Sequence, residues 1–489
     1  MKTMTAIAAA LAAFLSATSA NAATEIQWWH AFTGRLGNLL AEQVETFNAS
    51  QSEYVVVASH KGNYSETLNA GIAAFRAGEQ PHILQVFEVG TATMMAARGA
   101  VKPMYELMAE TGTTFDPGAY LAAVAGYYTT TDGEMLSLPY NSSTPVLYVN
   151  RDAFEAAALD PDMDLSTWEQ VGDALDALVA GGEDCALVTA WQSWVHLENL
   201  SAYHNVPFAT QDNGFAGLDT ELAFNGPVQV AHIRTMGEWA RDGKFIYTGR
   251  RNEGGANFRA GECALFTESS AGYAGVKANA QFEFDIRPLP YWASAGDAKL
   301  SEASAAIEAR ISDLRNQVAK TLPDPATYAV IYYRVQGMKE ARDIVQQMQP
   351  VPQNTIIGGA SLWVMEGHDP EEYAGVAAFL NFLSTSDIQA KWHQDTGYMP
   401  ITMAAYEQTR ASGFYEQNPG TDIAIIQMTA KAPTPDSKGL RLGSFDQIRG
   451  IIDEELEAVW AGDKTAQEAL DSAVERGNRL LRRFEQANR

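Results

Sequence analysis

The sequence predicts an α/β protein built from two lobes with a ligand cleft between them. Strand and helix patterns alternate from the start of the chain, and the alternation begins again near Leu136. Strands that alternate with helices predict mostly parallel sheets, with binding loops at the carboxyl ends of the strands. The 489 residues exceed what one simple core accommodates and suit two large lobes.

The individual elements follow from the spacing of apolar residues. In the first run we expect strands at Glu25–Phe32, Tyr54–Ser59 and His82–Phe87. We expect helices between them, from Leu36 to Phe47 and at Glu66–Gly78. In the second run we expect strands at Pro145–Tyr148 and Cys185–Thr189, with a helix at Trp168–Ala180 between them. Near the end of the chain we expect a long amphipathic helix from Ala466 to Phe484.

The segment from Ala293 to Pro352 does not fit this alternation. It is rich in Ala, Glu and Gln, and a Pro-Asp-Pro sequence separates two helical runs, Glu302–Thr321 and Tyr328–Gln349. We therefore expect a helical hairpin inserted at about 293–352. The predicted first lobe comprises residues 23–136 and 285–400 with this insertion, and the predicted second lobe comprises residues 137–284 and 401–489.

The first 22 residues have the pattern of a secretory signal peptide. Lys2 is followed by an apolar stretch too short to cross a membrane and by a small-residue cleavage site that ends at Ala22. We expect cleavage after Ala22 and export of the rest of the chain. No cysteine stands at the cleavage point, so the sequence predicts no lipid anchor.

The formal net charge is −26 at pH 7, and loss of Lys2 with the signal makes the mature chain one unit more negative. A nucleic-acid backbone or an anionic membrane requires a basic field, so the charge balance argues against binders of either. A small anion in a pocket remains compatible with it, because charges more than about 10 Å away across water are largely screened.

The two cysteines, Cys185 and Cys263, belong to an exported chain and so to an oxidising compartment. Each begins a similar Cys-Ala-Leu step, which suggests neighbouring strands. They form either one disulfide or two buried thiols, and their spacing fits neither a metal site nor a redox motif.

The sequence Ile356–Trp363 contains two adjacent glycines directly before an apolar strand. Glycines leave backbone N–H groups uncovered, so a ligand's oxygen atoms can approach Gly358 and Gly359 closely. We expect a loop at a strand edge that faces a ligand. The alternative is a tight turn in which Gly359 adopts a positive φ.

Several other side chains could contribute to a binding site. Trp191 and Trp194 follow a strand and could cover a ligand's carbon skeleton, although such pairs also pack between helices. Hydroxyl-rich turns at 141–145 and 267–272 suit hydroxyl or anion binding, or cap helices. Either Arg441 or Arg449 could hold a phosphate bidentately, or lie on the surface. Three further side chains stand at strand ends or in loops: Tyr64, Glu88 and Tyr398.

No motif supports catalysis. The eight histidines are scattered without metal-ligand spacing, and the chain has neither a Gly-x-Ser-x-Gly elbow nor a Walker-type loop. We therefore expect no enzyme activity, no cofactor and no metal.

Long stretches of the chain resemble the extracellular solute-binding proteins of bacterial ABC importers, in particular the periplasmic glycerol-3-phosphate-binding proteins of the Ugp system. The resemblance covers nearly all of the mature chain except 293–352. Its most distinctive stretches are Lys61–Tyr64, Gly71–Arg76, Gly90–Met95, Asn141–Tyr148, Ile356–Met365, Lys438–Gly443, Asp453–Leu456 and Ala473–Asn478.

The resemblance implies a two-lobed periplasmic-binding-protein fold like that of maltose-binding protein. It also implies a monomeric periplasmic receptor that binds a small phosphate ester without altering it and delivers it to permease subunits in the inner membrane. The residues that would hold the ligand are Tyr64, Glu88, Ser143, Trp191, Trp194, Ser269, Gly359, Tyr398 and Arg449. Arg449, Ser143, Ser269 and the Gly359 N–H would bind phosphate, Glu88 would accept from glycerol hydroxyls, and Trp191 would cover the carbon chain.

Three alternatives and one departure from the family remain. The protein could instead be a sugar receptor of the same fold, an exported phosphodiesterase or a scaffold without a small ligand. The inserted segment could cover the cleft mouth, alter the hinge or project into solvent, since surface insertions cost little closure entropy. It could also shift the ligand preference from glycerol 3-phosphate toward glycerophosphodiesters.

Overall fold

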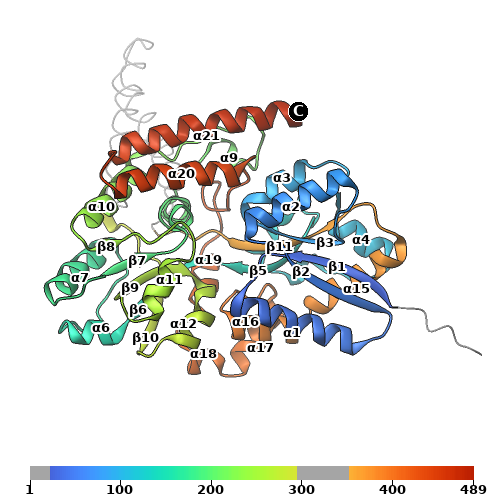
Figure 1. Ribbon diagram of the computed structural model, residues 1–489, viewed down its shortest axis with the longest axis horizontal. Coiled ribbons are helices and arrows are strands. Elements are labelled where there is room, and N and C mark those ends of the chain that lie inside the picture. Colours follow the sequence, from blue (N-terminus) through green and yellow to red (C-terminus); the bar gives the residue numbers. More distant parts are fainter. Residues whose placement is uncertain (1–22, 131, 295–351) are drawn as a thin grey trace, which may run out of the picture.

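The computed structural model describes residues 23–130, 132–294 and 352–489. Figure 1 shows two lobes side by side, each with a β-sheet flanked by helices. The expected signal peptide and the two helical runs of the expected hairpin lie outside the described residues. None of the described helices combines the length and the apolar character that a membrane span requires.

The first sheet lies in the right-hand lobe of Figure 1. Its strands are β1 Thr24–His30, β2 Tyr54–His60, β3 Ile83–Phe87, β4 Val101–Lys102, β5 Leu138–Ser143 and β11 Gly358–Met365. Hydrogen bonds give the order β2-β1-β3-β11-β4, and β5 also pairs with β11. β1 is parallel to β2 and β3, whereas β11 is antiparallel to β3, β4 and β5.

The second sheet has five strands in the order β10-β6-β9-β7-β8. Their bounds are β6 Pro145–Asn150, β7 Leu187–Thr189, β8 Phe245–Ile246, β9 Leu265–Ser269 and β10 Phe284–Pro288. β7 is parallel to β8 and β9, whereas β6 is antiparallel to β9 and β10.

The prediction of mostly parallel sheets is therefore wrong, because both sheets are mixed. The course of the chain explains why the first sheet contains an antiparallel strand. β3 ends beside the second lobe, whereas β11 starts there, after the chain has returned from that lobe. β11 must therefore run in the opposite direction to β3.

Helices cover both faces of each sheet (Figure 1). Before β6 they are α1 Gly34–Ser50, α2 Tyr64–Ala77, α3 Thr91–Ala96, α4 Met104–Glu110 and α5 Ala122–Ala125. Between β6 and β10 they are α6 Arg151–Ala156, α7 Trp168–Ala180, α8 Leu200–Tyr203, α9 Thr210–Asn213, α10 Pro227–Arg241, α11 Gly254–Arg259 and α12 Tyr273–Asn279. After β11 they are α15 Pro370–Leu383, α16 Ser386–Thr396, α17 Met403–Ala411, α18 Phe414–Gln417, α19 Ile423–Thr429, α20 Phe445–Trp460 and α21 Ala466–Asn488.

The expected strands and helices of both runs are present, and side-chain caps explain where the helices begin. Asn63 and Glu66 form a capping box, so α2 starts at Tyr64 rather than at Glu66, and Gly78 ends it in the left-handed conformation. A second capping box, from Thr167, fixes the start of α7 at Trp168 as expected.

The chain passes from the first sheet to the second between β5 and β6, and strand pairing keeps residues up to Pro288 in the second sheet. The lobe limits expected from the sequence fall a few residues before both points. The proposed division into two discontinuous lobes otherwise stays a prediction.

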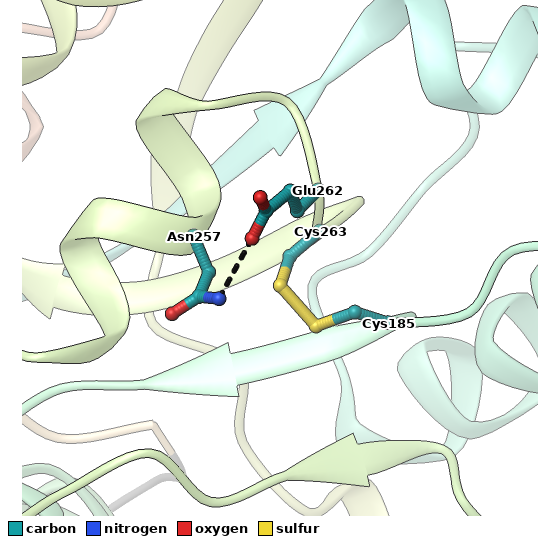
Figure 2. The surroundings of a disulfide bond; sticks show 4 residues. All are labelled: Cys185, Asn257, Glu262 and Cys263. Atoms are coloured by element: carbon teal, nitrogen blue, oxygen red, sulfur yellow. Dashed lines mark hydrogen bonds between the residues drawn. A yellow bond between two sulfur atoms is a disulfide. The ribbon is translucent and has the colours of Figure 1, made fainter.

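Cys185 and Cys263 form a disulfide (Figure 2). Each cysteine lies two residues before a strand, and these strands, β7 and β9, are parallel neighbours with Leu187 opposite Leu265. The expectation of neighbouring strands is confirmed, and the alternative of two buried thiols is excluded. Beside the disulfide, Asn257 donates a hydrogen bond to Glu262 at 2.8 Å.

Candidate functional site

A cavity of about 730 Å³ is lined by residues of both lobes. Most of its wall comes from segments at the carboxyl ends of strands, as expected for sheets that present binding loops at one edge. All nine residues expected to hold a ligand line this cavity: Tyr64, Glu88, Ser143, Trp191, Trp194, Ser269, Gly359, Tyr398 and Arg449. The structure thus brings together residues that lie up to 385 positions apart in the sequence.

The two glycines belong to the first residues of β11 rather than to a loop before it, which corrects the sequence interpretation. Gly359 has φ +95°, and a Cβ there would stand 1.8 Å from the carbonyl oxygen of Asn141. A Cβ on Gly358 would stand 2.4 Å from Cζ2 of Trp194. The structure shows neither a loop nor a tight turn here, but Gly359 has the positive φ of the second alternative and lines the cavity.

The two indoles line the cavity from the second lobe. Trp191 adopts a positive φ of 49°, and its indole N–H donates to Oδ1 of Asn252 at 2.6 Å. Trp194 starts a π-helix, Trp194–Asn199, a rare element that often marks functional sites. Its buried Nε1 has no hydrogen-bond partner within the described part of the chain, and this edge of the indole lies against Gly358.

Arg449, on α20, is buried and not a surface residue as one alternative had it. Its Nε and Nη2 donate to the two carboxylate oxygens of Glu198 at 2.8 and 2.7 Å. Nη2 also donates to Oε1 of Glu88 at 2.7 Å, which links the second lobe to the first. A bidentate pair of this kind fixes the orientation of the guanidinium group.

Burial controls the protonation of the acidic groups beside Arg449. It raises the pKa of Glu88, while the Arg449 charge opposes that rise. Burial also raises the pKa of Asp453, one turn along α20, to about 7, and the side-chain amide of Gln192 donates to its Oδ1 at 3.2 Å. Arg449 is therefore surrounded by buried carboxyl groups that all interact with its one positive charge.

The two tyrosines act as neutral phenols. Burial raises the pKa of Tyr64 well above its ordinary value and that of Tyr398 to about 12. The Tyr64 hydroxyl accepts a hydrogen bond from Nδ2 of Asn141 at 2.9 Å, so its own proton can be donated elsewhere. Both hydroxyls can therefore donate hydrogen bonds at neutral pH.

Sequence reasoning missed several polar residues of the site, among them Asn252, Arg259, Glu268 and Glu198. Asn252, Arg259 and Glu268 line the cavity, and Glu198 holds Arg449 from behind. Glu198 carries a weak signal, because it follows Trp194 by four residues within one helical segment. Arg441, the other arginine considered, does not line the cavity. It donates instead to the backbone carbonyls of Gly126, Tyr127 and Thr129.

Within residues 23–130, 132–294 and 352–489, one cluster outside the cavity has the residue types of a metal site: His82, His368 and Glu372. Nδ1 of His82 accepts a hydrogen bond from the backbone N–H of Gln27 at 2.9 Å, so in the neutral ring the proton is on Nε2. Nε2 is the atom that faces Glu372, at 3.4 Å. A metal would need a lone pair at this position, so the arrangement favours a weak His–Glu contact over metal binding.

The chain is similar to known proteins over nearly its whole length. It is 46% identical over 472 residues to the sn-glycerol-3-phosphate-binding periplasmic protein UgpB of Escherichia coli strain K12, covering 96% of this chain and 95% of that protein. It is 45% identical over 472 residues to UgpB of Yersinia pseudotuberculosis, with the same coverage.

Two solved structures share the fold. The structure of UgpB from Mycobacterium tuberculosis in complex with glycerophosphocholine has a TM-score of 0.71 at 18% identity, covering 94% of this chain and 99% of that one. Maltose-bound MalE3 of T. maritima has a TM-score of 0.68 at 16% identity, covering 94% and 100%. The expected fold, that of the maltose-binding type, is confirmed.

The model of the family described as bacterial extracellular solute-binding protein matches residues 42–421, which is most of the chain. Together with the near full-length identity to periplasmic relatives, this match identifies a periplasmic binding protein and not an enzyme. The chain belongs to the bacterial extracellular solute-binding protein family.

Proposed function

We propose that the protein captures sn-glycerol 3-phosphate, glycerophosphodiesters or both between its lobes. The relatives' names supply this ligand class, and the residues of the cavity are chemically suited to it. The observation that carries the proposal is the state of Arg449, a buried cation that faces the cavity with part of its donor capacity unused.

A guanidinium group has five N–H donors. Glu198 and Glu88 engage the donors of Nε and Nη2, and among the described residues no acceptor engages Nη1 of Arg449. Two N–H groups on one nitrogen thus remain for a ligand oxygen, on a group whose orientation is already fixed. Phosphate oxygens are the strong, anionic acceptors that suit such a donor.

The other lining groups suit the rest of the ligand. The Ser143 and Ser269 hydroxyls and the Gly359 N–H can donate to phosphate oxygens. The carboxylate of Glu88 can accept from glycerol hydroxyls, and Trp191 can cover the carbon chain. A neutral sugar could use the indoles and Glu88 but would leave the free donors of Arg449 without an anion.

Delivery follows from contacts to both lobes. A ligand that touches Glu88 and Tyr64 on one side and Arg449 and Trp191 on the other favours the closed arrangement of the lobes. We infer that the permease subunits of an ABC importer recognise that closed form, and that the receptor acts as a monomer.

Calorimetric titration of the mature protein with glycerol 3-phosphate, glycerophosphocholine and maltose tests the proposal. We expect one-to-one binding of a phosphate ester, no binding of maltose and no product after incubation. Arg449→Ala should weaken ester binding roughly tenfold to over a hundredfold, the effect of a lost charged hydrogen bond. Binding of maltose alone would favour a sugar receptor, and unchanged ester affinity in the variant would remove Arg449 from the site.

A further inference from the structure

The cavity is larger than glycerol 3-phosphate requires. That ligand has about ten non-hydrogen atoms and fills at most about 300 Å³, even at the ~30 Å³ that each water molecule occupies in the liquid. The cavity measures about 730 Å³, so more than half of it is left for another chemical group.

The cavity includes a part lined by α11, α12 and the segment from the end of β9 to α12, which we call the α11–α12 arm. Its residues are Arg259, Glu268, Gly272, Gly275 and Asn279. None of these five residues is among those that the proposed function assigns to the phosphate, the glycerol hydroxyls or the carbon chain. A ligand that also fills the arm must therefore extend beyond a glycerol phosphate.

The arm contains a cation without a strong partner. Arg259 is half-buried, and its Nη1 would stand 2.6 Å from a Cβ on Gly255 and 3.5 Å from one on Gly275. It takes part in none of the ion pairs within the described part of the chain. The acidic group that interacts with it is Glu268, whose own partner is the backbone N–H of Ser269 at 2.6 Å. Burial raises the pKa of Glu268 to about 8, so at neutral pH its carboxyl is mostly protonated and does not cancel the Arg259 charge.

We propose that the α11–α12 arm holds the headgroup of a glycerophosphodiester and that Arg259 favours headgroups with a carboxylate over those with only an ammonium group. The inference rests on the proposed function, which places the phosphate at Arg449. A guanidinium group pairs with a carboxylate and repels a cationic headgroup. Arg259 is then the residue that determines headgroup specificity.

Two diesters that differ by one group provide the test. Glycerophosphoserine carries a carboxylate that glycerophosphoethanolamine lacks, and glycerol 3-phosphate has no headgroup at all. We expect the wild-type protein to bind the serine ester about tenfold or more tightly than the ethanolamine ester. Arg259→Ala should abolish that preference while glycerol 3-phosphate affinity changes less than about twofold. Arg259→Lys should keep part of it.

Arg410→Ala is the matched control, because Arg410 is exposed, pairs with Glu407 and lies outside the cavity. Its thermal unfolding and that of Arg259→Ala should match the wild type. Equal affinity of the wild type for both diesters would overturn the proposal, as would a preference that survives Arg259→Ala. An equal loss of affinity for all three ligands in Arg259→Ala would place Arg259 at the phosphate and would also overturn the proposal. Absence of binding to any ester by the wild type would refute the proposed function itself.

Discussion

Replacing Arg449 with methionine should destabilise the unliganded protein in a strongly pH-dependent way. The substitution keeps a long side chain and removes the charge that Glu88 and Glu198 share. Both carboxyl groups are buried, with side chains 8% and 1% exposed, and together they accept three hydrogen bonds of 2.7–2.8 Å from Arg449. The variant leaves two carboxylates buried side by side without a cation.

The magnitude follows from what a buried carboxylate can do once its partner is gone. Loss of one member of a buried ion pair costs about 3–5 kcal/mol. A carboxyl group can limit this cost by binding a proton. From the ordinary pKa of 4.5, protonation at pH 7 costs about 3 kcal/mol, and at pH 5 it costs less than about 1 kcal/mol. For one carboxyl group the destabilisation should therefore shrink by about 3 kcal/mol between pH 7 and pH 5.

The sign follows from the proton balance. Burial already raises the pKa of Glu88 above its unfolded value, and removal of the Arg449 charge raises it further. The folded variant then binds more protons than the unfolded chain above pH 4.5, so it loses stability as the pH rises.

Urea denaturation of both proteins at pH 7 and pH 5, without ligand, measures the difference. The control is Arg410→Met, at an exposed pair whose loss should cost less than about 1 kcal/mol at either pH. A destabilisation of Arg449→Met that is equal at both pH values would show that buried charge is not its cause and would refute the reasoning.

Three further perturbations test other parts of the fold. Gly359→Ala should lower the free energy of unfolding by more than about 3 kcal/mol, because its Cβ meets a backbone oxygen at 1.8 Å. The control is Gly450→Ala, in open space beside Arg449, which should be neutral or stabilising by about 0.5–1 kcal/mol. Urea titrations measure both. Replacing Cys185 and Cys263 by serine should lower stability by about 4 kcal/mol, the entropy of a loop spanning 78 residues, and leave ester affinity unchanged. Burial lowers the pKa of His196 to about 3, whereas the ordinary value is 6.5. Neutral His196 therefore contributes fully to the free energy of unfolding above pH 6.5, and this contribution declines by about 1.4 kcal/mol per pH unit as the pH falls. His196→Gln should make the free energy of unfolding less dependent on pH in this range.

Much of the fold was predictable because local signals and the final packing agree. The period of apolar residues marked the strands and helices of both runs. α7 begins at Trp168 as expected, whereas α2 begins two residues before the expected Glu66, because the Asn63 capping box was not recognised in the sequence. The direction of β11 was not predictable in this way. It depends on which lobe the preceding segment leaves, and no local pattern records that.

The site shows the same division. The nine residues expected from the family resemblance all line one cavity. Tyr64, Ser143 and Gly359 stand in the most distinctive stretches of that resemblance, and the other six were matched segment by segment along the rest of the chain. Glu198 was missed because a glutamate inside an apolar helical segment looks like an isolated polar residue until the fold places a guanidinium group 2.8 Å from it. Arg259 and Glu268 were missed because their importance lies in the shape of the cavity, which sequence does not give.

The arrangement around Arg449 sets two conditions on a ligand of this chain, whose net charge is −26. Glu88 and Glu198 together outweigh the single charge of Arg449, so the site is not a general anion trap. On the proposed function, a bound ester must give Arg449 a phosphate oxygen and must give Glu88 a hydroxyl donor. Inorganic phosphate could satisfy the arginine but would place its negative charge near an uncompensated carboxylate. A neutral sugar could satisfy Glu88 but would leave the Nη1 donors without an anion. A molecule with a phosphate and nearby hydroxyl groups satisfies both, and the orientation fixed by Glu198 makes that requirement geometric as well as electrostatic.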